Sequence, residues 1–99
     1  MKTVLCFGDS NTWGYSPLDG SRHPHDVRWT GVLQNSLGDG FRVIEEGLNG
    51  RTNVTNEAER PIRSGLDVLP VILESHRPLD LVAIMLGTND LKHDFNLSA

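Results

Sequence analysis

Three short apolar runs, each followed by a polar turn, dominate the hydrophobic pattern of this 99-residue chain. Residues 3–7, 41–46 and 81–86 are rich in β-branched, aromatic and aliphatic side chains and therefore predict β-strands. The first run is apolar almost throughout, which is typical of a parallel strand covered on both faces. The second is more polar at its end, which indicates a position toward the edge of the sheet.

A first helix is predicted over residues 27–37, with Asp26 as its N-cap and Gly38 just past its end. Its apolar residues recur at helical spacing: Trp29, Val32, Leu33 and Leu37. Trp29, Val32 and Leu33 share a face and should pack on the sheet.

A second helix is predicted after Ser64, its expected N-cap, and it should end at Arg77-Pro78. Pro70 leaves two alternatives: the helix kinks there, or its regular part begins near Pro70, whose missing N–H costs nothing in a first turn. The apolar residues expected on one face are Leu66, Leu69 and Leu73. Residues 53–63 are polar without periodicity and predict a loop.

The order strand, helix, strand, helix, strand implies parallel crossovers, and hence an α/β fold: a three-layer α/β/α sandwich around a parallel sheet. Residues 1–99 form one domain in this interpretation, because no repeat or linker divides them. Residues 11–24 have the composition of a loop. Trp13 and Tyr15 within it either line a pocket or fold back on the core, and the sequence does not decide between these alternatives.

The net charge of −4, without a run of Lys or Arg, argues against a nucleic-acid or anionic-membrane partner. No apolar run is long enough for a signal peptide core or a membrane span, so we expect a cytoplasmic protein. The single cysteine, Cys6, falls inside the first strand and is expected to be a buried hydrophobic residue rather than a nucleophile. We expect no cofactor and no metal.

The three turns carry groups suited to acyl transfer, which needs a nucleophile and donors aimed at the developing oxyanion. Ser10 offers a hydroxyl and a backbone N–H, Gly50 lets the backbone approach a ligand closely, and Asn89 offers an amide donor. Because parallel strands place their carboxyl ends at one edge, these groups should converge. The alternative is that Asp9 and Ser10 serve only local turn hydrogen bonds.

The stretches Gly8-Asp9-Ser10-Asn11, Gly47-Leu48-Asn49-Gly50 and Gly87-Thr88-Asn89-Asp90 resemble, in order and spacing, the first three sequence blocks of the SGNH (GDSL) hydrolases. The neighbouring residues 26–33 and 84–90 resemble the arylesterase and acyltransferase branch. The resemblance implies a flavodoxin-like fold, a small ester substrate and a Ser10 nucleophile. It also implies an oxyanion hole made of the Ser10 N–H, the Gly50 N–H and the Asn89 side chain.

The family pattern ends with an Asp-x-x-His block that supplies the general base, and this chain stops before such a block. Asp90 and His93 have that spacing but directly continue the Asn89 turn, and Ser98 resembles the N-cap of a further helix. We therefore expect the amino-terminal part of one SGNH hydrolase domain, cut after the third strand and inactive alone.

Two other functions remain open at this point. The first is a flavodoxin-like module that binds a phosphate or nucleotide at the turn around Ser10 to Thr12. The second is a non-catalytic interaction domain that uses the open edge of the third strand, in which case a homo-oligomer is expected.

Overall fold

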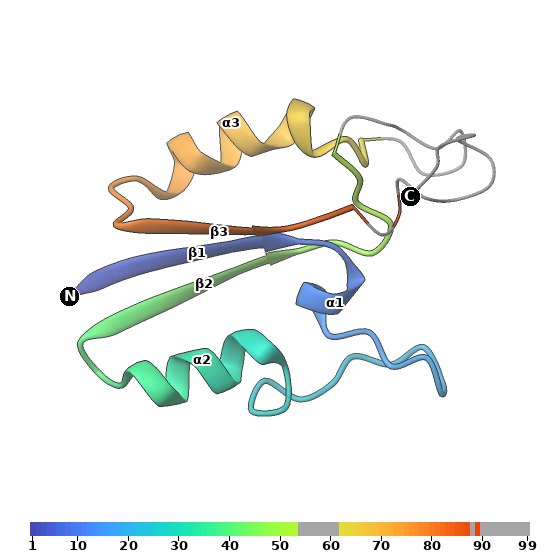
Figure 1. Ribbon diagram of the computed structural model, residues 1–99, viewed down its shortest axis with the longest axis horizontal. Coiled ribbons are helices and arrows are strands. Elements are labelled where there is room, and N and C mark those ends of the chain that lie inside the picture. The colour runs from blue at the N-terminus through green and yellow to red at the C-terminus, as the bar shows by residue number, and fades with distance from the viewer. Residues whose placement is uncertain (54–61, 88, 90–99) are drawn as a thin grey trace.

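A computed structural model describes residues 1–53, 62–87 and 89 of the chain. The described part contains, in chain order, β1 (Lys2–Gly8), α1 (Ser10–Trp13), α2 (Trp29–Leu37), β2 (Phe41–Gly47), α3 (Gly65–His76) and β3 (Leu81–Met85), as Figure 1 shows. The predicted strands are confirmed to within one residue at each end. The stretch 11–24 is not a loop throughout, because its first residues belong to the short helix α1.

The three strands form one parallel sheet in the order β2-β1-β3. Gly8, at the end of β1, is in register with Gly47 of β2 on one side and with Met85 of β3 on the other. The three strands therefore end level, and the turns that follow them leave the sheet at one edge.

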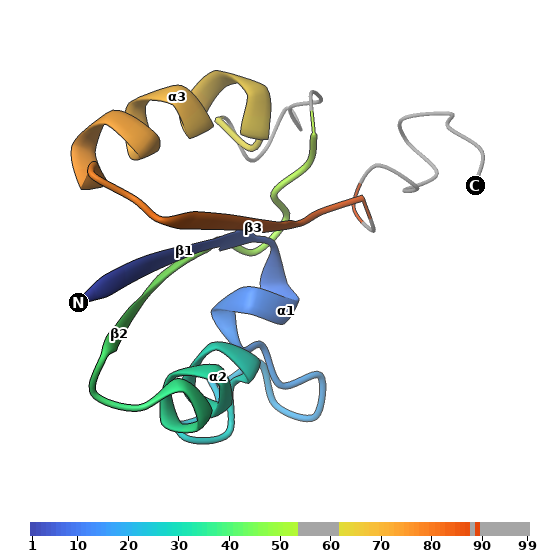
Figure 2. The ribbon, with the colours of Figure 1, turned by 60° about the vertical axis from the view of Figure 1, so that its left-hand side comes forward.

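Helices cover both faces of this sheet, as two views of the ribbon show (Figures 1 and 2). Helix α3 lies on one face, and α1 and α2 lie on the other. The central strand β1 holds the buried hydrophobic core, which consists of Val4, Leu5, Cys6 and Phe7. The predicted three-layer sandwich is confirmed, as is the prediction of a first strand covered on both faces.

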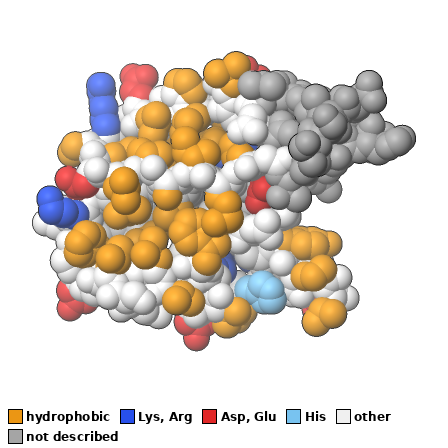
Figure 3. Space-filling view, viewed as in Figure 1, with side chains coloured by type: hydrophobic (Ala, Val, Ile, Leu, Met, Phe, Trp, Pro, Cys, Tyr) orange, Lys and Arg blue, Asp and Glu red, His pale blue; other side chains and the backbone are white. Residues whose placement is uncertain are grey.

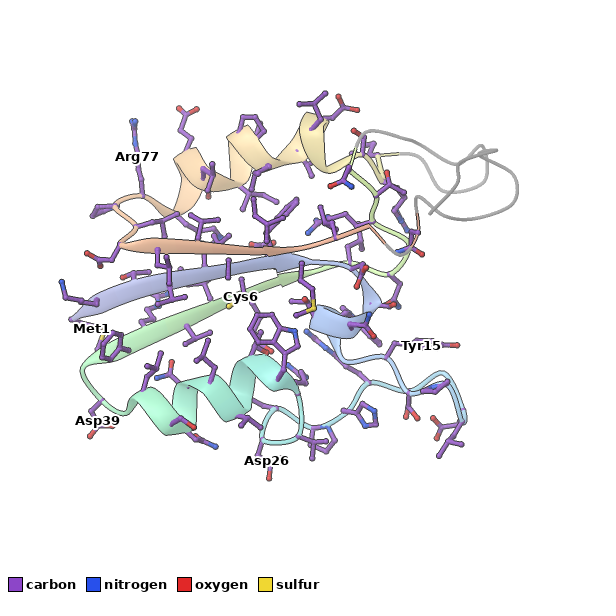
Figure 4. All side chains as sticks on the ribbon, viewed as in Figure 1. Met1, Cys6, Tyr15, Asp26, Asp39 and Arg77 are labelled. Atoms are coloured by element: carbon purple, nitrogen blue, oxygen red, sulfur yellow. The ribbon has the colours of Figure 1, made fainter. Side chains whose placement is uncertain are left out.

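Helix α2 begins two residues later than predicted, and Asp26 is not its N-cap. Arg28 is the N-cap residue, and its side chain makes no capping hydrogen bond. Asp26 lies in a turn that begins at Pro24, and its side chain points away from the protein (Figure 4). The reason is an ion pair between Arg28 and Glu45 of β2, which are 3.0 Å apart (Nη1 to Oε1). This ion pair holds Arg28 in an extended conformation against the sheet. Gly38 ends the helix as predicted.

The buried face of α2 also differs from the prediction. Val32 is 49% exposed and does not pack on the sheet. Thr30 and Gly31 are buried instead, and Gly31 comes so close to the His25 carbonyl that a side chain there would overlap it. This contact at a glycine turns the helix, so that Val32 faces outward.

Helix α3 contains Pro70 in its interior and begins five residues before it, so its regular part does not begin at Pro70. Ser64 is the N-cap residue, as predicted, although its side chain makes no capping hydrogen bond. Leu66, the first apolar residue of the helix, is 66% exposed. The inward face begins with Gly65, where an added Cβ would lie 3.1 Å from the Phe7 ring.

Hydrophobic side chains remain exposed on β3, the strand at one edge of the described sheet. Leu81, Ile84 and Met85 are between 46% and 59% exposed. Figure 3 shows hydrophobic side chains spread over the middle of one face of the molecule. None of the described helices has the length and apolar character needed to cross a membrane.

Candidate active site

An open pocket of about 170 Å³ lies at the carboxyl ends of the strands. Its lining residues come from all three turns and from the segment after α1: Ser10, Tyr15, Asn49, Gly50 and Asn89. The structure thus brings together the three residues that the sequence pattern singled out, although 79 positions separate Ser10 from Asn89.

The first turn places Ser10 at the start of α1. Asp9, only 1% exposed, caps this helix, because its Oδ1 accepts a hydrogen bond from the Asn11 N–H at 3.0 Å. Asp9 thus has a capping role, and it does not displace Ser10 from the pocket. As the first residue of α1, Ser10 has an N–H without an acceptor in the helix. No hydrogen bond to the Ser10 hydroxyl forms within the described residues.

The second turn lies directly against the first. The Leu48 N–H donates to the Gly8 carbonyl at 3.2 Å, and Gly47 lies so close to the Trp13 backbone that a Cβ would overlap it. Gly50 has a φ of +83°, a left-handed conformation that favours glycine. Its N–H donates to no acceptor within the described part of the chain, and Gly50 lines the pocket.

The third turn contributes the Asn89 side chain. Its Nδ2 donates a hydrogen bond of 3.0 Å to the carbonyl of Arg51. A side-chain amide has two N–H donors, so this bond fixes the orientation of the group and leaves the second N–H available for a ligand.

Arg51 lies beneath the second turn and is buried, with 5% of its surface exposed. Its Nη1 donates to the carbonyls of Glu46 at 2.6 Å and Gly8 at 3.3 Å. Its guanidinium carbon lies 4.1 Å from the centre of the Phe7 ring. Burial lowers the pKa of Arg51; the charge of Glu46 opposes this effect, and that of Arg63 adds to it. Sequence reasoning did not identify Arg51, because an arginine in a turn is ordinarily solvated.

The two aromatic residues of the loop after Ser10 have different roles. Tyr15 lines the pocket and projects from the end of the molecule where the strands end (Figure 4). Trp13 does not line it, and the Arg22 guanidinium lies 4.9 Å from its ring centre. His25 also lies away from the pocket, with its Nε2 4.0 Å from Glu45 Oε1.

Cys6 lies in the middle of the sheet (Figure 4) and is fully buried, as predicted. Burial raises the pKa of its thiol, and the nearby charge of Glu45 raises it further. A protonated thiol is a weak nucleophile.

Among the described residues, the pocket lining contains no histidine or carboxylate that could act as a base for Ser10. The stretch from Asp90 to His93 and Ser98 lie outside the described residues. Across residues 1–53, 62–87 and 89, no group of three or more His, Cys, Asp or Glu side chains is arranged to hold a metal ion.

The chain is similar to several solved esterases. It is 51% identical to the inhibitor-bound aryl esterase of M. smegmatis, with a TM-score of 0.94, over 99% of this chain and 47% of that one. It is 48% identical to Est24, a carbohydrate acetylesterase from Sinorhizobium meliloti, with a TM-score of 0.94, over 99% and 47% of the two chains. The similarity to AlinE4, an SGNH-hydrolase family esterase, is lower: 28% identity and a TM-score of 0.68, over 98% and 44%.

The chain therefore spans less than half the length of these esterases, and its three-layer arrangement is that of the SGNH hydrolase fold. Comparison with curated proteins gives no match. The sequence model of the GDSL-like Lipase/Acylhydrolase family matches residues 6–99. The match covers nearly the whole chain and includes all three turns, so the chain belongs to the GDSL-like lipase/acylhydrolase family.

Proposed function

We propose that this protein is a serine esterase that cleaves small esters through an acyl-enzyme on Ser10. One observation carries the proposal: Ser10, Gly50 and Asn89 line a single pocket where the strands end. Membership of an acylhydrolase family and similarity to aryl and carbohydrate esterases support it.

In the proposed reaction, the Ser10 hydroxyl oxygen attacks the ester carbonyl carbon and gives its proton to a base. The tetrahedral intermediate then collapses, the bond to the alcohol oxygen breaks, and the departing alcohol takes up that proton. Water attacks the resulting acyl-serine in the same way and releases the acid. Each tetrahedral intermediate carries a negative oxygen, which must be stabilised by donors already in place.

Three donors are available for this oxygen. The N–H groups of Ser10 and Gly50 have no acceptor in the described structure, and the second N–H of Asn89 is free of the bond to Arg51. Two of these donors are backbone groups of adjacent turns, and the Asn89 side chain is held by its bond to the Arg51 carbonyl, so they need little reorganisation when charge develops.

We assign the general base to a histidine outside the described residues, because the described pocket lining offers none. The family resemblance supports this assignment, since SGNH hydrolases carry an Asp-x-x-His block that follows the three blocks found here. Without a base, a serine hydroxyl is a weak nucleophile at neutral pH.

Similarity to Est24, a carbohydrate acetylesterase, favours short acyl groups. We therefore propose acetyl-sized acyl groups as the preferred substrates, with Tyr15 in contact with one end of the ester. Acyl transfer to an alcohol in place of water is a second outcome open to the same acyl-enzyme.

A phosphate- or nucleotide-binding function has less support. The part of the pocket lining that the structure describes contains neither Lys nor Arg, and the Asp9 carboxylate lies one residue before Ser10. Arg51 is close in space, but its Nη1 donates to backbone carbonyls.

Hydrolysis of p-nitrophenyl acetate by the natural protein that carries this chain, at its full length, tests the proposal. We expect Ser10→Ala to abolish turnover and labelling by a fluorophosphonate. Ser36→Ala, an exposed serine on α2, is the matched control and should keep both. Full activity of Ser10→Ala would refute the mechanism. Adding an alcohol and measuring the new ester separates transfer from hydrolysis.

A further inference from the structure

Arg51 is a buried cation for which the described structure offers no carboxylate partner. Burying a charge is costly unless it is paired and hydrogen-bonded, and buried arginines are ordinarily matched by an acidic side chain. The nearby carboxylate of Glu46 instead pairs with His76, with Glu46 Oε1 2.9 Å from His76 Nε2. Among the described residues, the positive charge of Arg51 is therefore not neutralised by a direct ion pair.

The contacts of Arg51 reach all three turns of the candidate site. Its Nη1 holds the carbonyl of Gly8, two residues before Ser10, and that of Glu46 at the end of β2. Its own carbonyl accepts the hydrogen bond from Asn89. Arg51 also directly follows Gly50, so a shift of its backbone would move the Gly50 peptide.

Two buried polar atoms without hydrogen bonds flank Gly50. They are Asn49 Oδ1 and Arg51 Nε, and neither finds a partner in the described structure. Unsatisfied buried polar groups are uncommon in folded proteins and call for an explanation, of which a role in function is one. Their position on either side of a proposed oxyanion donor is consistent with a turn held for function at some cost in stability.

We propose that Arg51 is a positioning residue for the oxyanion hole, an inference that rests on the proposed esterase function. The guanidinium fixes the spacing between the Ser10 turn and the Gly50 turn, and the anchored Arg51 carbonyl orients the Asn89 amide. The charge of Arg51, which has no ion pair among the described residues, also favours negative charge on an oxyanion in the adjoining pocket, because the attraction of a buried charge is screened less than that of a charge in bulk water.

Two substitutions at Arg51 separate geometry from charge. Arg51→Met removes the charge and both hydrogen bonds, and we expect kcat to fall about 10- to 100-fold with KM nearly unchanged. Arg51→Lys keeps a cation but loses the planar fork of donors, so it should recover only part of kcat. Arg42→Met, at an exposed position on β2, is the matched control and should keep full activity.

All rates are measured in the natural full-length protein and divided by the number of sites titrated with a fluorophosphonate. A purely structural role would lower the number of sites and leave kcat per site unchanged. A positioning role also raises the Ki of a boronic acid, which forms a tetrahedral adduct on serine, by about the same factor as kcat/KM falls.

A double-mutant cycle keeps the inference testable if Arg51→Met does not fold. Arg51→Lys should cost clearly less in an Asn89→Ala background than alone, because the amide that Arg51 orients is then absent. Additive effects, or a normal kcat per site and normal Ki in the Arg51 variants, would overturn the proposal. Ser10→Ala is measured alongside. If Ser10→Ala stays active, the esterase mechanism itself is refuted. If Ser10→Ala is inactive while the Arg51 variants are fully active, only the role of Arg51 is refuted.

Discussion

The indole Nε1 of Trp29 donates a hydrogen bond to Thr12 Oγ1, at a distance of 3.2 Å. This bond joins α2 to α1, the short helix that carries Ser10. Thr12 is fully buried, and it lies so close to Gly8 that a Cβ at Gly8 would overlap its side chain. The indole thus helps to hold the Ser10 turn against the end of β1.

We expect Trp29→Ala to lower the free energy of unfolding by about 3 kcal/mol, because it removes a large, partly buried side chain. Trp29→Phe, which keeps an aromatic ring but loses the hydrogen bond, should cost about 1 kcal/mol. Val32→Ala on the exposed face of α2 should cost no more than about 0.5 kcal/mol. Urea unfolding of the natural full-length protein gives all three values, and equal losses for Trp29→Ala and Val32→Ala would contradict the packing described.

Gly47→Ala should both destabilise the protein and lower kcat. Its new Cβ would overlap the Trp13 backbone and push α1 away from the second turn. Overpacking of this kind costs roughly 1 to 3 kcal/mol. Gly40→Ala is the matched control, because an added Cβ there has no neighbour within 4 Å. Urea unfolding and ester hydrolysis measure the two effects, and a Gly47→Ala protein as stable and active as Gly40→Ala would rule out this close contact.

Glu45 should make stability depend on pH. Burial tends to raise the pKa of Glu45, but hydrogen bonds from Thr30 and Arg28, with the charges of Arg28 and His25, bring it below its ordinary value of 4.5. A lowered pKa in the folded state stabilises the protein above the unfolded pKa, and this contribution is lost as pH falls through the folded pKa. The stability difference between wild type and Glu45→Gln should therefore be largest near neutral pH and shrink below about pH 4.

Urea unfolding at several pH values measures this difference. Asp39→Asn is the control: it removes an exposed carboxylate that points away from the protein (Figure 4) and has no ion pair among the described residues. If Glu45→Gln lowers the free energy of unfolding by the same amount at neutral and acidic pH, the Glu45 carboxylate is not stabilised by its neighbours.

The strands and turns could be predicted from the sequence because their signals are local. The apolar run from Val4 to Phe7 is short and continuous, and the turn residues mark where each strand ends. The outward position of Val32 could not be predicted, because the close contact between Gly31 and the His25 carbonyl sets the rotation of α2. A glycine carries no hydrophobic signal of its own, so the pattern assigned its neighbours to the buried face.

The residues of the candidate site divide in the same way, into those with a local sequence signal and one without. Ser10, Gly50 and Asn89 follow strands and could be placed at one edge by topology alone. Arg51 could not be recognised, because its role depends on carbonyls of Gly8 and Glu46 that only the folded sheet brings to it. Backbone acceptors leave no trace in the identity of the residues that carry them.

Asn89→Ala should lower kcat by roughly 10²- to 10³-fold with little change in KM, since the amide is proposed to act mainly in the transition state. Hydrolysis of p-nitrophenyl acetate by the natural full-length protein provides the measurement. Asn35→Ala, an exposed asparagine on α2, should leave both constants unchanged. A fully active Asn89→Ala protein would remove Asn89 from the mechanism, while Ser10 could still act as the nucleophile.

Residues 1–99 alone should not turn over esters efficiently. The described pocket holds proposed donors and a serine but no base. An intact oxyanion hole without the catalytic base leaves a rate enhancement of roughly 10³- to 10⁴-fold over the reaction in water. We expect residues 1–99 to show at most this residual enhancement. The exposed side chains Leu81, Ile84 and Met85 on β3 should also cause association or poor solubility of the isolated 99 residues.

A chimera tests this expectation directly. Residues 1–99 are fused to the part of the M. smegmatis aryl esterase that they do not match, which is feasible because the matched parts are 51% identical with a TM-score of 0.94. The added part should cover β3 and bring a base to Ser10, so solubility and turnover should return together. The chimera with Ser10→Ala and the added part alone are the controls, and both should be inactive. Efficient, Ser10-dependent turnover by residues 1–99 alone would defeat the prediction, and it would make His23, His25 and His93 the candidates for a base within these residues.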